Sequence, residues 1–143
     1  MNVPVKKLDP NAKLPVRGSS AAAGADLCAL DKVEIAPGAT AMVPTGLAVE
    51  IPDGYVGLIF ARSGLATKLG LAPANKVGVI DSDYRGELMV ALLNHSSGTR
   101  SVAAGERIAQ LCIVPYVAAD YCEVDELSDT ERGCGGFGST GTH

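Results

Sequence analysis

The sequence has no tryptophan, two phenylalanines and four tyrosines, so aromatic side chains make up only 4% of its 143 residues. Without large aromatic rings, a core must be built from Val, Ile, Leu and Ala, which bury less apolar area per residue. Hydrophobic residues still reach 47%, which is enough for one core at single-domain length. Self-association could supply the burial that aromatic residues do not provide.

The four cysteines, Cys28, Cys112, Cys122 and Cys134, contain no C-x-x-C pair and have no histidines at metal-binding spacing. This pattern indicates neither a zinc site nor a disulfide framework, and we expect buried free thiols. The net charge of −4 repels a polyanion, so no nucleic-acid partner is expected.

Long apolar segments are also missing. The longest, residues 111–119, is interrupted by Pro115 and is far shorter than the roughly 20 residues that cross a bilayer. The N-terminus lacks the apolar stretch of a secretory signal. We therefore expect a cytoplasmic protein with no membrane partner.

Helical periodicity is scarce, whereas short β-branched runs bounded by Gly, Pro, Asn and Asp recur along the chain. The predicted strands cover residues 32–35, 40–44, 47–51, 55–61, 76–80, 87–94 and 107–117, with turns at 36–38, 52–54, 83–86 and 96–98. Only residues 63–69 indicate a short helix, with Ser63 as its cap. The prediction is an all-β, jelly-roll-like barrel or sandwich.

The pattern of strands ends near Leu127, and residues 128–143 are polar and rich in glycine. We predict a domain over residues 1–127 and a flexible tail over 128–143. The tail contains Arg132, Phe137, Ser139 and Thr140 among its glycines. It is either a plain solvated terminus or a segment whose donors bind phosphate while Phe137 stacks on a base.

Several polar residues adjoin the predicted strands. Arg62 and Ser63 lie at the start of the short helix, where they either bind an anion or serve the local structure. Asp81 ends the apolar run 77–80, so it is either a turn acid or a base whose strength is raised by desolvation at the edge of the core. Asp26 either orders water around Mg²⁺ or simply ends a strand, and Gln110 is uninformative alone.

Taken in order, the segments AGADLCAL, ARSGLATKLG, NKVGVIDSDYRGEL, GERIAQL and RGCGGFGSTG resemble the five motifs of the deoxyuridine triphosphatase (dUTPase) family. The resemblance extends from Ala23 to Gly141. It implies a jelly-roll homotrimer that hydrolyses dUTP to dUMP and pyrophosphate with Mg²⁺, in three sites that each combine residues of all three chains. Such an activity keeps uracil out of DNA and supplies dUMP for dTMP synthesis.

The same resemblance implies a role for individual residues. Asp81 deprotonates the water that attacks the α-phosphorus, Tyr84 packs on the deoxyribose, and Asp26 holds a metal-bound water. The hairpin residues that receive uracil are Asn75, Gly78, Val79 and Ile80. The phosphates are held by Arg62, Ser63, Gly64 and Gln110, and the tail residues that close over the substrate are Arg132, Phe137, Gly138, Ser139 and Thr140.

Two alternatives remain at this stage. A dCTP deaminase has the same fold, although that family uses a glutamate where this chain has Asp81. A non-enzymatic trimer that responds to dUTP as a regulatory signal is the other. The departures from the family pattern are small: Ala61 stands where many members have proline, and Cys134 occupies a variable tail position.

Overall fold

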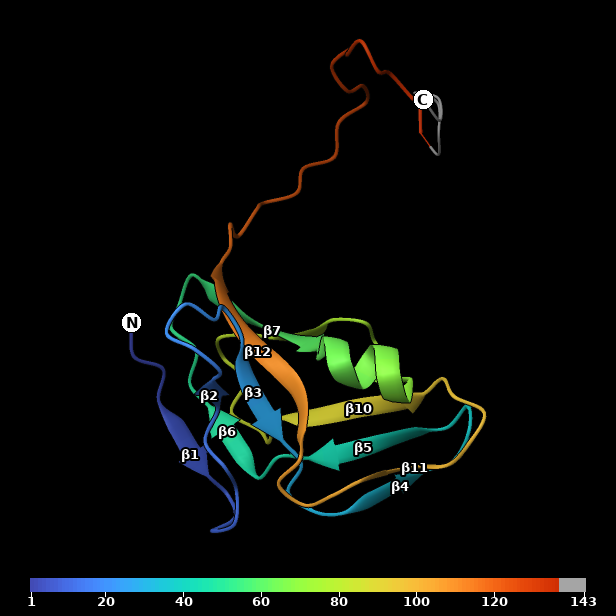
Figure 1. The fold of residues 1–143 in the computed structure, drawn as a ribbon. Coiled ribbons are helices and arrows are strands. Elements are labelled where there is room, and N and C mark those ends of the chain that lie inside the picture. The colour runs from blue at the N-terminus through green and yellow to red at the C-terminus, as the bar shows by residue number, and fades with distance from the viewer. Residues whose placement is uncertain (137–143) are drawn as a thin grey trace.

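The structure is a computed structural model and describes residues 1–136. Its largest sheet has five antiparallel strands in the order β2-β3-β12-β7-β9, of which the first four are labelled in Figure 1. These strands are β2 (Val16–Arg17), β3 (Ala25–Cys28), β12 (Arg107–Pro115), β7 (Tyr55–Ala61) and β9 (Gly78–Ile80). Strand β12 lies at the centre, between β3 and β7, and therefore links the start of the chain to its middle.

A second antiparallel sheet has the order β5-β10-β8. Its strands are β5 (Thr40–Pro44), β10 (Met89–Asn94) and β8 (Leu71–Pro73). Two smaller ladders pair β1 (Val5–Lys7) with β6 (Leu47–Val49) and β4 (Val33–Ile35) with β11 (Arg100–Val102). The fold is all-β and jelly-roll-like, as predicted, and residues 1–136 form no closed barrel.

The seven predicted strands are all present, and two of them, β5 and β7, have the predicted bounds. The sequence did not predict β1, β2, β3, β8 and β11, which have two to four residues each. In strands this short, apolar and polar residues alternate too few times for a two-residue period to be recognised in the sequence. They exist because segments elsewhere in the chain pair with them, as β12 pairs with β3.

The core is aliphatic, as the scarcity of aromatics requires. In β10 the buried residues Val90, Leu92 and Asn94 alternate with partly exposed ones, which gives the two-residue period of a strand that covers a core. Asn94 is the one polar residue among the largest fully buried side chains. Its amide nitrogen donates to the carbonyl oxygens of Ile35 (2.9 Å) and Gly98 (2.8 Å), so its burial leaves no donor unsatisfied.

The predicted short helix exists as η1 (Leu65–Leu69), a π-helix that ends at Gly70. The predicted cap is wrong, because Gly64 stands at the N-cap position and no side chain caps the helix. Instead, the Thr67 hydroxyl donates to the Ser63 carbonyl oxygen at 2.8 Å. The Ser63 side chain therefore does not serve the start of the helix.

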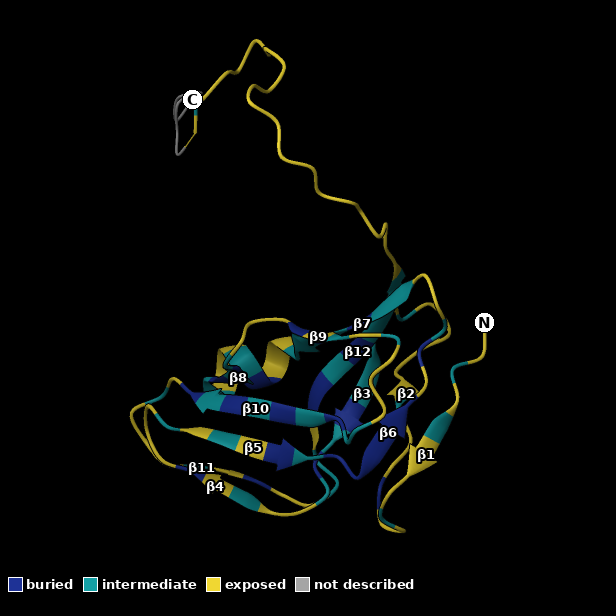
Figure 2. Ribbon diagram, turned by 180° about the vertical axis from the view of Figure 1, so that it is seen from behind, coloured by how far each residue is buried: buried dark blue, intermediate teal, exposed yellow. Residues whose placement is uncertain are grey.

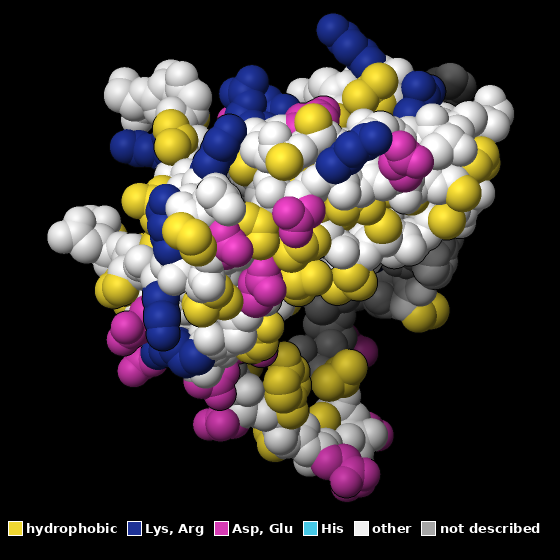
Figure 3. All heavy atoms as spheres, turned by 90° about the horizontal axis from the view of Figure 1, so that it is seen from below, with side chains coloured by type: hydrophobic (Ala, Val, Ile, Leu, Met, Phe, Trp, Pro, Cys, Tyr) yellow, Lys and Arg dark blue, Asp and Glu magenta, His cyan; other side chains and the backbone are white. Residues whose placement is uncertain are grey.

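After β12 the chain leaves the sheets, and residues 116–136 form no strand or helix (Figure 2). All of these residues except Gly135 are exposed. Among the described residues, no helix is long and apolar enough to span a membrane. On the face shown in Figure 3, acidic and basic side chains are interspersed with hydrophobic ones.

The cysteines are free thiols, as expected, but the prediction that they are buried is wrong. Cys28 and Cys112 are partly exposed, and Cys122 and Cys134 are fully in the exposed class. The last two lie beyond β12, where the chain has left the core.

Candidate active site

The register of the large sheet brings three of the sequence motifs together. Asp26 in β3 pairs with Gln110 in β12, and Gln110 pairs with Phe60 near the end of β7. Arg62 follows β7 directly. Residues far apart in sequence thus meet around a pocket of about 270 Å³, which we call the phosphate-side pocket. Its lining residues are Gly18, Ala22, Gly24, Asp26, Arg62, Ser63, Gly64, Arg107 and Gln110.

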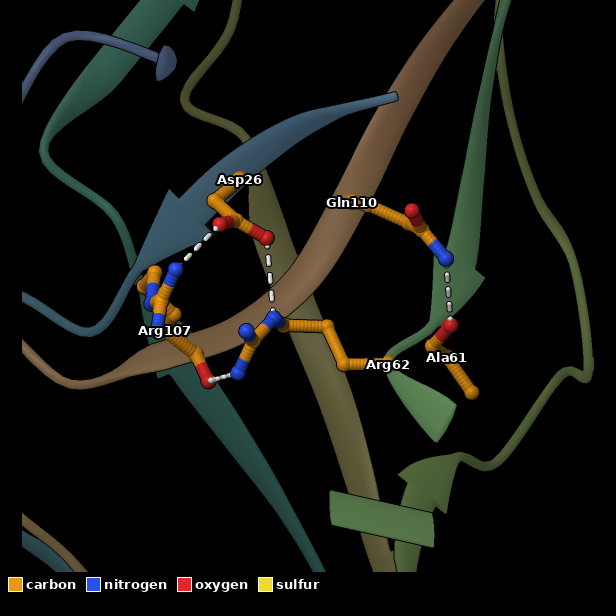
Figure 4. Close-up of polar contacts among 5 residues, drawn as sticks. All are labelled: Asp26, Ala61, Arg62, Arg107 and Gln110. Atoms are coloured by element: carbon orange, nitrogen blue, oxygen red, sulfur yellow. Dashed lines mark hydrogen bonds and ion pairs between the residues drawn. The ribbon is translucent and has the colours of Figure 1, made fainter. Parts of the chain in front are cut away.

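Asp26 joins two arginines in this pocket (Figure 4). One carboxylate oxygen accepts from Arg62 Nε at 2.8 Å, and the other accepts from Arg107 Nη1 at 3.0 Å. Only 17% of the Asp26 side chain is exposed, so both contacts lie partly out of water. One carboxylate cannot neutralise two guanidinium groups, and the pocket keeps a positive charge that favours an anion.

The sequence did not single out Arg107. A β-bulge lies between Arg107 and Ala109, so the two-residue alternation of β12 does not carry through to Arg107. The Arg107 carbonyl oxygen also accepts from Arg62 Nη1 at 3.3 Å. This residue therefore contacts both members of the pair formed by Asp26 and Arg62. Its membership of the segment GERIAQL was the only signal for it.

Gln110 lines the pocket and donates from Nε2 to the Ala61 carbonyl oxygen on the neighbouring strand β7, at 2.9 Å (Figure 4). Its side chain lies against Gly24, where an added Cβ would be 2.6 Å from Gln110 Oε1. A side chain at position 24 would therefore displace the Gln110 amide, a second feature that reasoning from single residues missed.

The side chains of the phosphate-side pocket fit a magnesium ion that is bound mainly by the oxygens of a polyphosphate. Residues 1–136 contain no group of three or more His, Cys, Asp and Glu side chains that could hold a metal directly. Asp26 is the one acidic residue lining the phosphate-side pocket. Mg²⁺ keeps several waters and takes few protein ligands, so a single carboxylate can contact it through water.

The third motif lies elsewhere, on β9 and the turn that follows it. A hollow of about 520 Å³ is lined by Asp81, Ser82 and Asp83 together with Val79 and residues of β7. A smaller one, of about 130 Å³, includes Asn75, Gly78, Val79 and Ile80. We call this segment, residues 75–87, the nucleoside-side hairpin. The expected desolvation of Asp81 is not found, because the residue is exposed.

The turn after β9 begins earlier than predicted. The Tyr84 N–H donates to the Asp81 carbonyl oxygen at 3.2 Å, which closes a turn over residues 81–84 in place of 83–86. Asp83 lies inside this turn. At the other end of the hairpin, Lys76 has φ of 65° and is the one non-glycine residue with positive φ in the described part of the chain. Such a conformation costs about 1 kcal/mol or more.

One chain does not bring the two groups of residues together. Ile80 pairs with Gly57 in β7, so Asp81 lies opposite Val56, whereas Arg62 comes after the last residue of that strand. Six residues of extended strand span about 20 Å. A general base must lie within hydrogen-bonding distance of the attacking water, so Asp81 cannot act on a phosphate held by Arg62 of the same chain.

The tail residues are only partly described. Arg132 is exposed, and its Nε donates to the Gly135 carbonyl oxygen at 2.8 Å. Phe137, Gly138, Ser139 and Thr140 lie outside the described residues.

A cysteine lies beside the phosphate-side pocket. Cys28 lines a neighbouring pocket of about 330 Å³ that also includes Lys13, Asp26 and Arg107. Burial raises the pKa of the Cys28 thiol, and the nearby positive charge of Lys13 offsets part of that rise.

Comparisons with known proteins identify the family of the chain. The family model for dUTPase matches residues 10–141. A protein of Nautilia profundicola, named deoxyuridine 5'-triphosphate nucleotidohydrolase, is 51% identical over 141 residues and covers 99% of each chain. One of the same name from Desulfitobacterium hafniense is 53% identical over 136 residues, which are 93% of this chain and 90% of the relative.

Solved structures show the same relationship. A Staphylococcus bacteriophage 80alpha dUTPase with dUPNHPP superposes with a TM-score of 0.93 at 34% identity over 99% of both chains. A mutant dUTPase from phage phi11 of S. aureus, described as coordinating a structural Mg(II) ion, has a TM-score of 0.82 at 30% identity, covering 88% of this chain and 98% of that one. The chain belongs to the dUTPase family.

Proposed function

We propose that this protein hydrolyses dUTP to dUMP and pyrophosphate in a site that two or more copies of the chain build together. The activity rests on the near-full-length match to dUTP nucleotidohydrolases. The assembly rests on the separation of about 20 Å between the base and the phosphate-binding residues of one chain. The names of the relatives support dUTP hydrolysis. They do not support a dCTP deaminase or a trimer with a purely regulatory role.

The phosphate-side pocket of one chain binds the triphosphate. The Arg62 guanidinium, oriented by Asp26, supplies charge-assisted hydrogen bonds, and Gln110 and Gly64 line the same pocket. The Ser63 hydroxyl makes no capping hydrogen bond to η1, so it can donate to the oxygen that bridges the α- and β-phosphates. A donor at that oxygen stabilises the negative charge that develops as the bond breaks.

The nucleoside-side hairpin of a neighbouring chain binds the rest of the substrate. Main-chain groups around Asn75, Gly78, Val79 and Ile80 pair with uracil, and Tyr84 borders the deoxyribose. Asp81 takes a proton from a water whose oxygen bonds to the α-phosphorus, while the bond to the bridging oxygen breaks and pyrophosphate leaves. An exposed Asp81 fits this role, because a partner chain can then cover it.

The remaining parts complete the site. When bound, Mg²⁺ neutralises charge on the phosphates and holds them in one conformation. Asp26 would hold the ion through water. The tail of a third copy, residues 128–143, closes over the substrate: Phe137 stacks on uracil, and Arg132, Gly138, Ser139 and Thr140 engage the phosphates and exclude water. We place the reaction in the cytoplasm, where it keeps uracil out of DNA and supplies dUMP for dTMP synthesis.

A direct assay tests the activity. The protein is incubated with Mg²⁺ and either dUTP or dCTP, and pyrophosphate and ammonia are measured. We expect pyrophosphate from dUTP and no ammonia from dCTP. Ammonia release from dCTP would replace this proposal with a deaminase, and absence of both products would leave only the regulatory alternative.

Mixing two variants, each of which lacks one group of the proposed site, tests whether the site is shared. Asp81→Asn lacks the base, and Ser63→Ala lacks the hydroxyl on an exposed residue, so neither change disturbs the core. The two proteins are mixed, dissociated and reassembled. If the site takes Asp81 and Ser63 from different chains of a trimer, random mixing restores roughly a quarter of the wild-type sites. No recovery, in a mixture shown by mass measurement to contain mixed trimers, would place both residues in one chain.

A further inference from the structure

The tyrosine of the nucleoside-side hairpin lies directly on a glycine. A Cβ added at Gly86 would stand 2.6 Å from Tyr84 Cζ and 2.9 Å from Tyr84 Cε2, and would also collide with the hydroxyl oxygen. Side chains do not approach one another this closely, so any residue with a side chain at position 86 must displace the ring. Gly86 is not among the glycines with positive φ, which means that this position requires only the absence of a side chain.

The ring is also held at its far end. The Tyr84 hydroxyl donates to the Glu87 carbonyl oxygen at 2.9 Å, and the Tyr84 N–H closes the turn to the Asp81 carbonyl oxygen. Arg85 Nη1 donates to the carbonyl oxygens of Ser82 (2.6 Å) and Tyr84 (3.0 Å), which stabilises the same turn. The orientation of the ring is thus set relative to the Asp81 backbone before any substrate binds.

We propose that Gly86 is a positioning residue for substrate specificity: it lets the Tyr84 ring lie against the hairpin in the one position that fits a deoxyribose and leaves no room for a 2′-hydroxyl. This inference rests on the proposed function, in which Tyr84 borders the sugar. Gly86 touches no substrate and acts only through the ring. Rejection of UTP by a steric wall requires that the wall be fixed, because a mobile ring would move away from the extra oxygen.

The experiment compares kcat/KM for dUTP with kcat/KM for UTP in Gly86→Ala and in wild type. We expect the ratio of the two constants to fall at least about tenfold, since an added hydroxyl is excluded by shape alone. The matched control is Gly98→Ala: an added Cβ at Gly98 meets no atom within 4 Å, and this glycine also lacks positive φ. Its ratio stays at the wild-type value. An unchanged ratio in a folded Gly86→Ala protein overturns the inference.

The double variant Tyr84→Ala/Gly86→Ala separates an effect through the ring from a general effect on the hairpin. If Gly86 acts through Tyr84, adding Gly86→Ala to Tyr84→Ala leaves the dUTP to UTP ratio unchanged. A further fall of the same size in the Tyr84→Ala background would show that the ring is not involved, and would overturn the inference.

If Gly86→Ala fails to fold, Tyr84→Phe provides a second test of whether a fixed ring sets the dUTP to UTP ratio. This change adds no volume and removes only the hydroxyl that holds the ring to Glu87, so we expect the ratio to fall about fivefold, as for one lost hydrogen bond. An unchanged ratio in Tyr84→Phe overturns the inference in that case. Wild-type hydrolysis of dUTP tests the proposed function separately, so a protein that cleaves dUTP but shows no change of ratio refutes the role of Gly86 alone.

Discussion

The phosphate-side pocket and the nucleoside-side hairpin are built in different ways. The pocket takes residues from strands β3 and β12 and from the segment that follows β7, and its charged groups are joined by ion pairs from Asp26 to Arg62 and Arg107. The hairpin is one continuous segment held by its own turn, and its Asp81 is exposed. The first is organised by the folding of a single chain. The second acts, in the function proposed above, only together with a neighbouring copy of the chain, so changes in the two regions should have different consequences.

The largest effect is expected for Asp81, the proposed general base, which lies on the nucleoside-side hairpin. Asp81→Asn removes a proton acceptor without changing shape, so we expect dUTP turnover to fall by about 10²–10⁴, with nucleotide binding retained. Steady-state kinetics and calorimetric titration with a non-hydrolysable analogue measure the two quantities. Asp83→Asn is the control, because Asp83 lies in the same turn. Wild-type turnover in Asp81→Asn would refute its assignment as the base.

The next effect concerns the tail, which belongs to neither region. Ending the chain after Glu131 removes Arg132 and the residues that follow it. Since residues 116–136 form no strand or helix, we expect an unchanged unfolding midpoint and a turnover reduced by about 10–100-fold. Circular dichroism and a pyrophosphate assay measure these. A chain that unfolds after this cut would show that the tail serves the fold rather than the reaction.

The ion pairs of the pocket predict an effect on stability. Asp26→Asn leaves Arg62 and Arg107 without their carboxylate, and we expect the free energy of unfolding to fall by about 1–3 kcal/mol. The Arg107 side chain is more than half exposed, so its ion pair with Asp26 contributes only a small part of this loss of stability. Asp81→Asn, which breaks no ion pair in the described structure, should unfold at the wild-type urea concentration. Equal loss in both variants would contradict the contrast between the two regions.

The smallest effect is a difference between thiols. Cys28 is half-buried beside the pocket and its pKa is raised by burial, while Cys134 in the tail is exposed. A raised pKa means that less of the Cys28 thiol is ionised at pH 8, so alkylation should be several-fold slower there than at Cys134. The rate at Cys28 should keep rising above the pH at which an ordinary thiol is fully ionised. Mass spectrometry of timed samples assigns each site, and equal rates would contradict the burial of Cys28.

Residues 1–136 show which parts of the candidate site could be predicted. Arg62, Ser63 and Asp81 stood out because each adjoins a strongly patterned strand, β7 or β9. Arg107 and Gly24 did not, since a bulge interrupts the alternation at Arg107 and nothing local marks the approach of Gln110 to Gly24. The partners of Asp26 depend on strands that are distant in sequence, and local patterns contain no information about such pairing.

The sequence alone determined the all-β class, the aliphatic core and the order of the five motifs, because these follow from composition, two-residue periodicity and residue spacing. Only the tertiary structure decided that Asp26 joins two arginines, that Ser63 does not cap η1, and that Asp81 and Arg62 lie toward opposite ends of β7. The reason is physical: strand register positions polar residues through the pairing of distant segments, and the burial of each group depends on every element around it.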